Sequence, residues 1–284
     1  GSSGGFLLSF LAAFDAGDRV ALASPGYPAY RNILLALDLV PVDIPTGPDT
    51  RFQPTPELLA QAEGPLAGLI VASPSNPAGT MIDPDHFAAL ADYCRRHDMR
   101  LISDEIYHGI TYGMDTVTAA SLDPDAVVVN SFSKYYAMTG WRLGWMLLPE
   151  DLLRSVESLA QNLFISPPAL PQHAALAAFD CRSELDALVA RYAENRRILL
   201  EGLPAAGFER FAPADGAFYL FADIGTLTND SEAFCRRMLE ETGVATTPGI
   251  DFDRARGHRF LRISFAGATD EIAAAVRRLQ AWRR

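Results

Sequence analysis

The sequence Asn130-Ser-Phe-Ser-Lys134-Tyr-Tyr-Ala-Met-Thr-Gly-Trp-Arg142 follows directly on the apolar run Ala126-Val-Val-Val129. That run is short, β-branched and not alternating, which predicts a strand buried on both faces. It delivers Lys134 into a loop of hydroxyls and glycine, in a chain where lysine is scarce. Most lysines are solvated, so the alternative is a strand-end lysine that simply reaches water. A desolvated lysine with a lowered pKa, in contrast, is the group that forms Schiff bases with carbonyl compounds.

Helical and strand patterns alternate around this stretch. We expect strands at residues 19–23, 40–44, 67–72, 100–104, 126–130 and 143–148, and helices at residues 5–14, 30–37 and 83–97. Pro41 places its strand at an edge or a bulge, and Thr55-Pro56 is expected to begin a further helix, with the threonine as its cap. The alternation predicts an α/β fold of three layers, a mostly parallel sheet with helices on both faces.

The pattern changes after Pro149. Residues 150–164 and about 169–203 are predicted to be helical, and the second helix is long enough to bridge two domains. Strands expected at residues 217–221 and 260–264, with helices at about 230–242 and 269–282, predict a smaller α+β domain. We therefore expect a large domain at residues 1–190 and a small C-terminal domain at residues 191–284.

Composition and charge exclude several functional classes. With 284 residues the chain can form one large domain or two smaller ones. A net charge of −11 argues against a non-specific nucleic-acid binder and against binding to an anionic membrane surface. No apolar run reaches the roughly 20 residues that a membrane helix needs. Three widely spaced cysteines (Cys94, Cys181 and Cys235) fit reduced thiols in a cytoplasmic protein better than a disulfide framework.

Polar residues stand at the ends of several predicted strands, where open parallel sheets bind their ligands. They are Asn76 in Ser73-Pro-Ser-Asn-Pro77, Asp104 with Tyr107, and Ser131 with Lys134. An acid that ends an apolar strand is costly unless it has a cationic partner. Taken singly, Asp104 could be a helix cap or a structural ion pair, and Asn-Pro could be a plain turn. Their order and spacing together indicate one site.

This combination resembles the class I/II aminotransferases, the fold-type I family of pyridoxal-phosphate enzymes. The resemblance covers essentially the whole chain, and the block from Ser131 to Arg142 is its most specific part. It implies that pyridoxal 5′-phosphate serves as cofactor in a ping-pong transfer of an α-amino group from an amino acid to a 2-oxo acid. The implied partners are these two substrates and, in the full-length protein, a second copy in a homodimer. The motifs do not reveal the substrate side chain.

The resemblance also implies roles for single residues. Lys134 matches the lysine that holds the cofactor covalently and then acts as acid and base. Asp104 matches the carboxylate that keeps the pyridine nitrogen protonated, so that the ring can accept electrons. Asn76 and Tyr107 match the pair that hydrogen-bonds the cofactor's phenolate oxygen, and Tyr27 matches the aromatic residue that stacks on the ring.

The phosphate and the substrate have matching residues of their own. Ser131 and Arg142 match phosphate ligands, and the fork of an arginine suits phosphate oxygens. Arg262, which would otherwise be a surface strand arginine, matches the residue that binds the substrate's α-carboxylate, with Asn76 also at the substrate. The turn that holds Ser2 and Ser3 opens into a helix, as in the family's phosphate cup. We therefore interpret both serines as native phosphate-binding residues rather than an expression-tag remnant.

Family members carry roughly a hundred further residues ahead of this point, so the chain is expected to be an N-terminally truncated piece that lacks part of the small domain. Two alternatives share the fold. One is a pyridoxal-phosphate-dependent C–S lyase that catalyses β-elimination. The other is the aminotransferase-like effector domain of a transcription regulator, although nothing basic in the chain supports DNA binding. The histidines are scattered without ligand spacing, so no metal is predicted.

Overall fold

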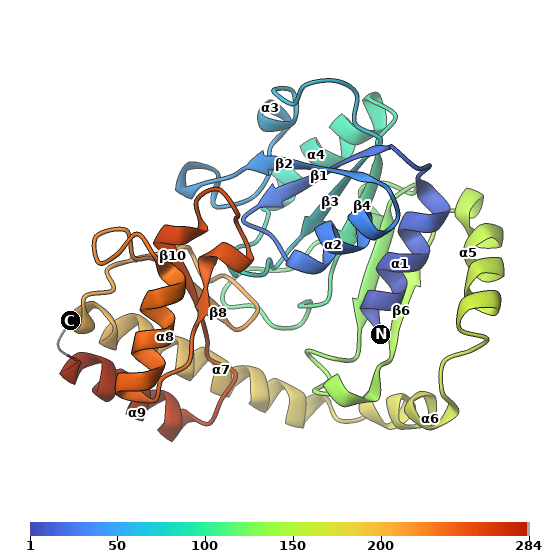
Figure 1. Cartoon of the computed structure of the whole chain (residues 1–284). Helices are drawn as coiled ribbons and strands as arrows, with labels where there is room; N and C mark the ends of the chain where they lie inside the picture. Colours follow the sequence, from blue (N-terminus) through green and yellow to red (C-terminus); the bar gives the residue numbers. More distant parts are fainter. Residues whose placement is uncertain (283–284) are drawn as a thin grey trace.

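Two β-sheets organise the chain in the computed structural model, which describes residues 1–282 (Figure 1). The larger sheet has six strands in the order β2-β1-β3-β4-β5-β6, and the smaller sheet has four in the order β7-β8-β10-β9. Within the described residues, no helix combines the length and the apolarity needed to cross a membrane.

The six-stranded sheet is parallel except for its last pair, β5 and β6, which is antiparallel. This confirms the prediction of a mostly parallel sheet. The strand with Pro41 lies at the edge, as predicted, where a missing N–H costs no ladder bond. The strands are β1 (Arg19–Ser24), β2 (Val40–Pro45), β3 (Gly68–Ala72), β4 (Arg100–Asp104), β5 (Val127–Ser131) and β6 (Gly144–Leu147).

Helices cover both faces of this sheet, which confirms the three-layer α/β fold (Figure 1). On one face, α1 (Ser2–Ala13), α2 (Pro28–Ala36) and α5 (Glu150–Leu163) bury Phe10, Leu34 and Val156 against the strands. On the other face, α3 (Pro56–Leu59) and α4 (Pro84–Arg96) bury Leu59 and Phe87. Because successive strand residues point to opposite faces, a strand buried on both faces must be apolar throughout.

Two helices differ from the predictions by more than two residues. The first helix begins at Ser2 rather than at residue 5, because its N-terminal turn packs against the start of β6. The helix predicted at 169–203 is two helices, α6 (Ala169–Ala178) and α7 (Arg182–Gly202). At the break, the ring of Phe179 packs on Phe132 and Tyr136, with both pairs of ring centroids 5.6 Å apart. The helical periodicity of the sequence does not reveal such a tertiary contact, so the break between the two helices was not predicted.

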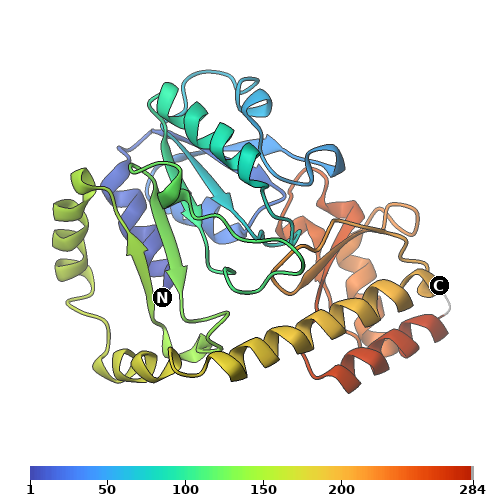
Figure 2. The ribbon, with the colours of Figure 1, turned by 180° about the vertical axis from the view of Figure 1, so that it is seen from behind.

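The C-terminal elements build the smaller sheet and its cover. Helix α7 runs from the large sheet to the small one (Figure 2), and its Tyr192 and Leu199 share a core with Val276 and Leu279 of α9. The two-residue strands β7 and β9 were not predicted, because two residues form no pattern. The elements are β7 (Arg210–Phe211), β8 (Tyr219–Asp223), α8 (Ser231–Thr242), β9 (Thr247–Pro248), β10 (Phe260–Ser264) and α9 (Thr269–Ala281).

Substitution of Gly144 tests how closely the start of α1 packs against β6. A Cβ atom at this position would lie 2.6 Å from the carbonyl oxygen of Asn130 and 3.2 Å from the backbone nitrogen of Ser2. We expect Gly144→Ala to lower the unfolding free energy by about 1–3 kcal/mol, because backbone atoms must shift. Gly140→Ala is the matched control, since a Cβ there meets no described atom within 4 Å. Thermal denaturation measures both, and equal melting temperatures would contradict the expectation.

Candidate functional site

A cavity of about 320 Å³ lies beyond the carboxyl ends of β3, β4 and β5 and is also walled by the smaller sheet. The strand-end residues that are separate in the sequence meet here, as the parallel order requires. Every residue predicted for the site except Ser131 lines this cavity: Ser2, Ser3, Tyr27, Asn76, Asp104, Tyr107, Lys134, Arg142 and Arg262.

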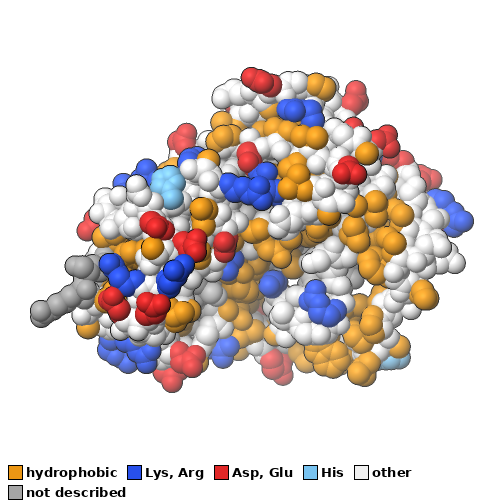
Figure 3. Space-filling view, viewed as in Figure 1, with side chains coloured by type: hydrophobic (Ala, Val, Ile, Leu, Met, Phe, Trp, Pro, Cys, Tyr) orange, Lys and Arg blue, Asp and Glu red, His pale blue; other side chains and the backbone are white. Residues whose placement is uncertain are grey.

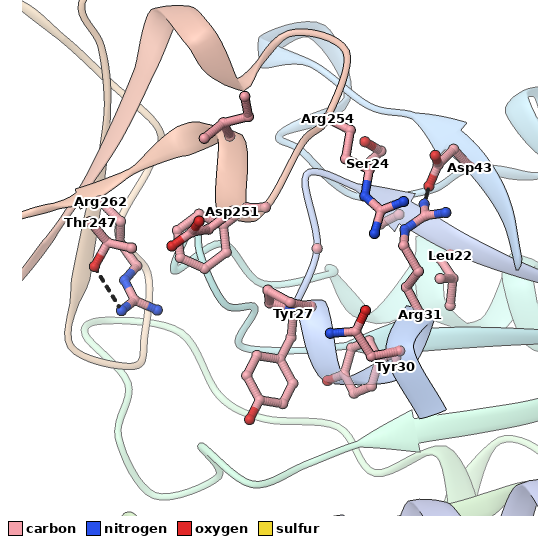
Figure 4. Close-up of a pocket in the computed structure, with 16 residues that line it drawn as sticks. Leu22, Ser24, Tyr27, Tyr30, Arg31, Asp43, Thr247, Asp251, Arg254 and Arg262 are labelled. Atoms are coloured by element: carbon pink, nitrogen blue, oxygen red, sulfur yellow. Dashed lines mark hydrogen bonds and ion pairs between the residues drawn. The ribbon is translucent and has the colours of Figure 1, made fainter. Parts of the chain in front are cut away.

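A second cavity of about 550 Å³ adjoins the first and shares Tyr27, Tyr30 and Arg262 with it (Figure 4). Its polar wall includes the ion pair of Arg31 with Asp43. The two cavities together form a cleft between the sheets, with Arg262 reaching in from the smaller sheet.

Lys134 is the only lysine in the 284-residue sequence. Its Nζ lies 5.8 Å from the ring centroid of Tyr107 and 5.7 Å from that of Phe218. Burial lowers the pKa of the Lys134 ammonium, the charge of Asp104 acts in the opposite direction, and Arg262 and Arg142 lower it further. Lys134 is therefore half-buried in the cavity wall rather than freely solvated, and its lowered pKa increases the share of the neutral, nucleophilic amine.

Asp104 is 4% exposed, and its hydrogen-bond partners are neutral groups rather than the cation that the sequence predicted. The carboxylate accepts hydrogen bonds from the hydroxyl of Tyr30 and, at 3.1 Å, from the N–H of Ile106. Burial raises the pKa of the carboxyl to about 6, although both hydrogen bonds lower it. Sequence reasoning missed Tyr30, which lies 74 positions away and carries no local signal of this contact. A buried carboxylate without a salt bridge among the described residues can pair with a cationic group of a ligand.

Arg262 is held between two aromatic rings, with its Cζ 4.4 Å from the ring centroid of Tyr219 and 4.7 Å from that of Phe252. One Nη donates to Asn76 Oδ1 at 2.7 Å. The other donates to Thr247 Oγ1 at 3.2 Å (Figure 4). Its Nε is buried and has no partner among the described residues. Arg262 is thus not a surface arginine, and its guanidinium can still receive a carboxylate.

The opposite end of the cavity is suited to an anion. Ser2 and Ser3 form the first turn of the 12-residue helix α1, which has no side-chain cap. Arg142 lies against this turn and donates through Nη1 to the carbonyl oxygen of Thr139 at 2.8 Å. Free backbone N–H groups, the helix dipole and a guanidinium all favour a dianion such as a phosphate.

Ser131 does not reach the cavity. Its hydroxyl is buried, donates to the carbonyl oxygen of Leu143 at 2.9 Å and accepts from the N–H of Ser133 at 3.0 Å. Ser133, two residues further along the turn, lines the cavity. The two hydroxyls lie 2.9 Å apart, so Ser131 lies directly behind Ser133, and its predicted contact with a phosphate stays a prediction. The hydroxyl of Tyr107 lies 2.9 Å from that of Tyr219, a second residue that was not predicted.

Comparison with known proteins agrees with this arrangement. A family model described as aminotransferase class I and II matches residues 1–279. The valine–pyruvate aminotransferase of Mycobacterium tuberculosis is 58% identical over 99% of this chain and 74% of its own length. A crystal structure of an aminotransferase from that organism superimposes with a TM-score of 0.98, over 99% of this chain and 74% of the other, at 58% identity. Aspartate aminotransferase from Thermus thermophilus, solved with maleate, gives a TM-score of 0.91 at 32% identity and the same coverage.

Proposed function

The chain belongs to the class I and II aminotransferases, and on this premise we propose that it binds pyridoxal 5′-phosphate through Lys134 and uses an aliphatic amino acid as donor. Transfer of an amino group from an amino acid to a 2-oxo acid is the activity that the family relationship establishes. The valine–pyruvate activity of the M. tuberculosis relative supports valine as donor and pyruvate as acceptor. The proposal rests above all on one observation, the presence of Lys134, Asp104 and Arg262 in a single cavity.

The polar groups of the cavity fit those of the cofactor. Asp104, buried without a salt bridge among the described residues, suits a protonated pyridine nitrogen. The first turn of α1, Arg142 and Ser133 suit the phosphate. We also propose that Asn76 and Tyr107 donate hydrogen bonds to the phenolate oxygen of the cofactor. The ring of Tyr27, which is 37% exposed, offers a surface on which the cofactor ring can stack.

When bound, the cofactor supplies an electron sink that stabilises negative charge at the α-carbon of the substrate. Lys134 provides the covalent link, and its lowered pKa increases the share of the neutral amine, which takes and returns the α-proton at Nζ. Asp104 keeps a proton on the ring nitrogen by its negative charge. Arg262 binds the α-carboxylate and so fixes the amino acid within reach of Lys134.

Donor specificity tests the proposal. Purified protein reconstituted with the cofactor is mixed with single amino acids, and the absorbance of one half-reaction is followed. We expect valine and similar aliphatic donors to react fastest, and pyruvate to restore the starting spectrum with formation of alanine. Pyruvate and ammonia released from cysteine without an acceptor would instead indicate a lyase. A protein that neither binds the cofactor nor reacts with any donor would contradict the proposal outright.

A homodimer is part of the proposal. Large apolar side chains are exposed over the end of α5 and over α6, where Figure 3 shows hydrophobic surface gathered. Two of them, Phe164 and Ile165, also line a cavity that includes Ser2 and Arg142. Exposed apolar surface of this kind marks protein interfaces, and light scattering would test the dimer. These side chains are Leu163, Phe164, Ile165, Leu170, Leu176 and Phe179.

Two further assignments from the sequence remain proposals. We propose a domain boundary near residue 190, within α7, which is supported by the shared core of Leu199, Val276 and the smaller sheet. We also propose a cytoplasmic location, which is supported by the free state of all three cysteines. Limited proteolysis and cell fractionation test the two assignments.

A further inference from the structure

The ring of Phe218 lies beside the amine of Lys134 but does not itself line the cavity. Nζ of Lys134 is 5.7 Å from the ring centroid of Phe218 and 5.8 Å from that of Tyr107. The two rings meet edge to face, at an interplanar angle of 85° and with their centroids 5.5 Å apart. Together Tyr107 and Phe218 form an aromatic corner that adjoins the amine with two rings.

The amine of Lys134 has no polar partner that holds it in this place. Among the described residues, Nζ takes part in no hydrogen bond and no ion pair, and Asp104, Arg262 and Arg142 act on it only through their charges. A lysine amine on its flexible four-carbon stem adopts many positions unless something restricts it. The face of an aromatic ring attracts an ammonium group, and its apolar surface favours contact with the methylene stem. The aromatic corner therefore supplies the restriction that polar groups do not.

The backbone ahead of β8 fixes the position of Phe218. The N–H of Gly216 donates to the carbonyl oxygen of Gly79 at 2.9 Å. The N–H of Ala217 donates to the carbonyl oxygen of Ile110 at 3.0 Å. Ala217 is left-handed, with a φ of 57°, a conformation that is costly for a residue with a side chain and persists where the surroundings impose it. Hydrogen bonds to loops of the large sheet thus direct the ring toward the amine.

Two tyrosine rings pack on Phe218 as well. The ring centroid of Tyr192, in α7, lies 5.5 Å from that of Phe218, and the centroid of Tyr219 lies 4.9 Å away. In a close-packed interior these contacts oppose any movement of the ring away from Lys134. Phe218 therefore presents a fixed apolar surface to a side chain that is otherwise free to move.

We propose that Phe218 is a positioning residue that holds the unattached amine of Lys134 at the cavity wall, where it exchanges the α-proton of the substrate. The inference rests on the proposed function, which supplies the proton transfer, whereas the contact itself is present in the chain alone. Lys134 can take the proton only while its amine is not attached to the cofactor. An amine that leaves the wall would reach the α-carbon less often, so the aromatic corner raises the rate of proton transfer.

Nuclear magnetic resonance tests the contact, because a protein labelled with carbon-13 lysine carries a single labelled side chain. Spectra are recorded without cofactor and with pyridoxamine 5′-phosphate, which has no carbonyl group to which the amine could attach. In both samples we expect a nuclear Overhauser effect between the Cε protons of Lys134 and the ring of Phe218. In Phe218→Leu the Cε proton signal is expected to move toward its position in a solvated lysine, because the shielding by the ring is lost.

The half-reaction with valine tests the consequence. In Phe218→Leu we expect a maximal rate about tenfold lower, with the cofactor still attached to Lys134 after borohydride reduction. The valine concentration that gives half the maximal rate is expected to stay within about twofold, because the contacts of Arg262 are unchanged. Phe218→Tyr keeps the ring and should bring the rate back to within about twofold of the unaltered protein.

Phe211→Leu is the matched control. Phe211 is also half-buried against the core that Phe218 joins, but its ring is not one of those beside the amine of Lys134. This variant is expected to keep both the Lys134 signal and the rate. An equal loss of rate in Phe211→Leu would overturn the proposal, because the effect would then arise from the core and not from the amine.

Three further outcomes separate this inference from the proposed function. Absence of the Overhauser effect in the unaltered protein would overturn the inference without any variant. If the unaltered protein carries no cofactor on Lys134, the proposed function and the inference both fail. If the cofactor is attached and Phe218→Leu leaves the Lys134 signal or the rate unchanged, only the inference fails.

Discussion

Lys134→Ala is expected to lower the rate of amino transfer by about 10⁴-fold or more, because both the covalent link to the cofactor and the acid–base group are lost. The chain holds no other lysine. After borohydride reduction, the unaltered protein should therefore carry one cofactor on the peptide with Lys134, and the variant should carry no attached cofactor on any peptide. Intact-protein and peptide mass spectrometry measure the attachment, and the half-reaction with valine measures the rate.

Lys134→Arg is the matched control. It keeps a cation in the cavity near Asp104 but cannot form the covalent link, because a guanidinium does not lose its proton in proteins. Both variants are expected to be inactive and free of attached cofactor, and both should still fold. Activity of Lys134→Ala near that of the unaltered protein would remove Lys134 from the proposed site.

Asp104→Asn is expected to have opposite effects on activity and on stability. A neutral amide no longer holds the proton on the ring nitrogen, so the half-reaction should slow by about 10³-fold. In the cofactor-free protein, the same change removes a buried charge that has no salt bridge among the described residues. The amide oxygen can still accept from the N–H of Ile106, and the amide nitrogen, in the place of the other carboxylate oxygen, can donate to the hydroxyl of Tyr30. The variant should therefore be more stable than the unaltered protein at pH 8.

The pH dependence of this stability difference follows from the raised pKa. Burial raises the pKa of Asp104 from 3.8 to about 6, so the folded state binds more protons than the unfolded state between these values. The contribution of Asp104 to stability therefore falls as pH rises through this window and stays low above it. Melting curves at pH 4 and pH 8 should show the advantage of Asp104→Asn growing from near zero to at most about 3 kcal/mol.

Glu105→Gln is the control for Asp104→Asn. Glu105 is also buried, but its carboxylate accepts from the hydroxyl of Ser103 and the N–H of Ala119, outside the cavity. We expect this variant to keep the cofactor spectrum and to lose stability at pH 8. An Asp104→Asn protein that is less stable than the unaltered protein at pH 8 would contradict the argument.

The sequence by itself determined the class of the fold and the identity of most cavity residues. Continuous apolar runs such as Val127–Val129 specify strands buried on both faces, because every residue of such a strand must itself be apolar. Asn76, Asp104 and Lys134 end or follow three neighbouring parallel strands, so their meeting in one cavity follows from strand order alone. The block from Ser131 to Arg142 pointed to the family, which the comparisons confirm.

Only the tertiary structure decided which side chains complete the site. Tyr30 bonds to Asp104 across 74 positions, Tyr219 pairs with Tyr107 across 112, and Arg262 reaches Asn76 across 186. The same holds for the choice of Ser133 over Ser131 at the cavity wall, which depends on how the turn after β5 folds against Leu143. A local pattern records whether a residue is buried. It does not record which distant hydroxyl or ring meets that residue, because that partner is chosen by the packing of the two sheets.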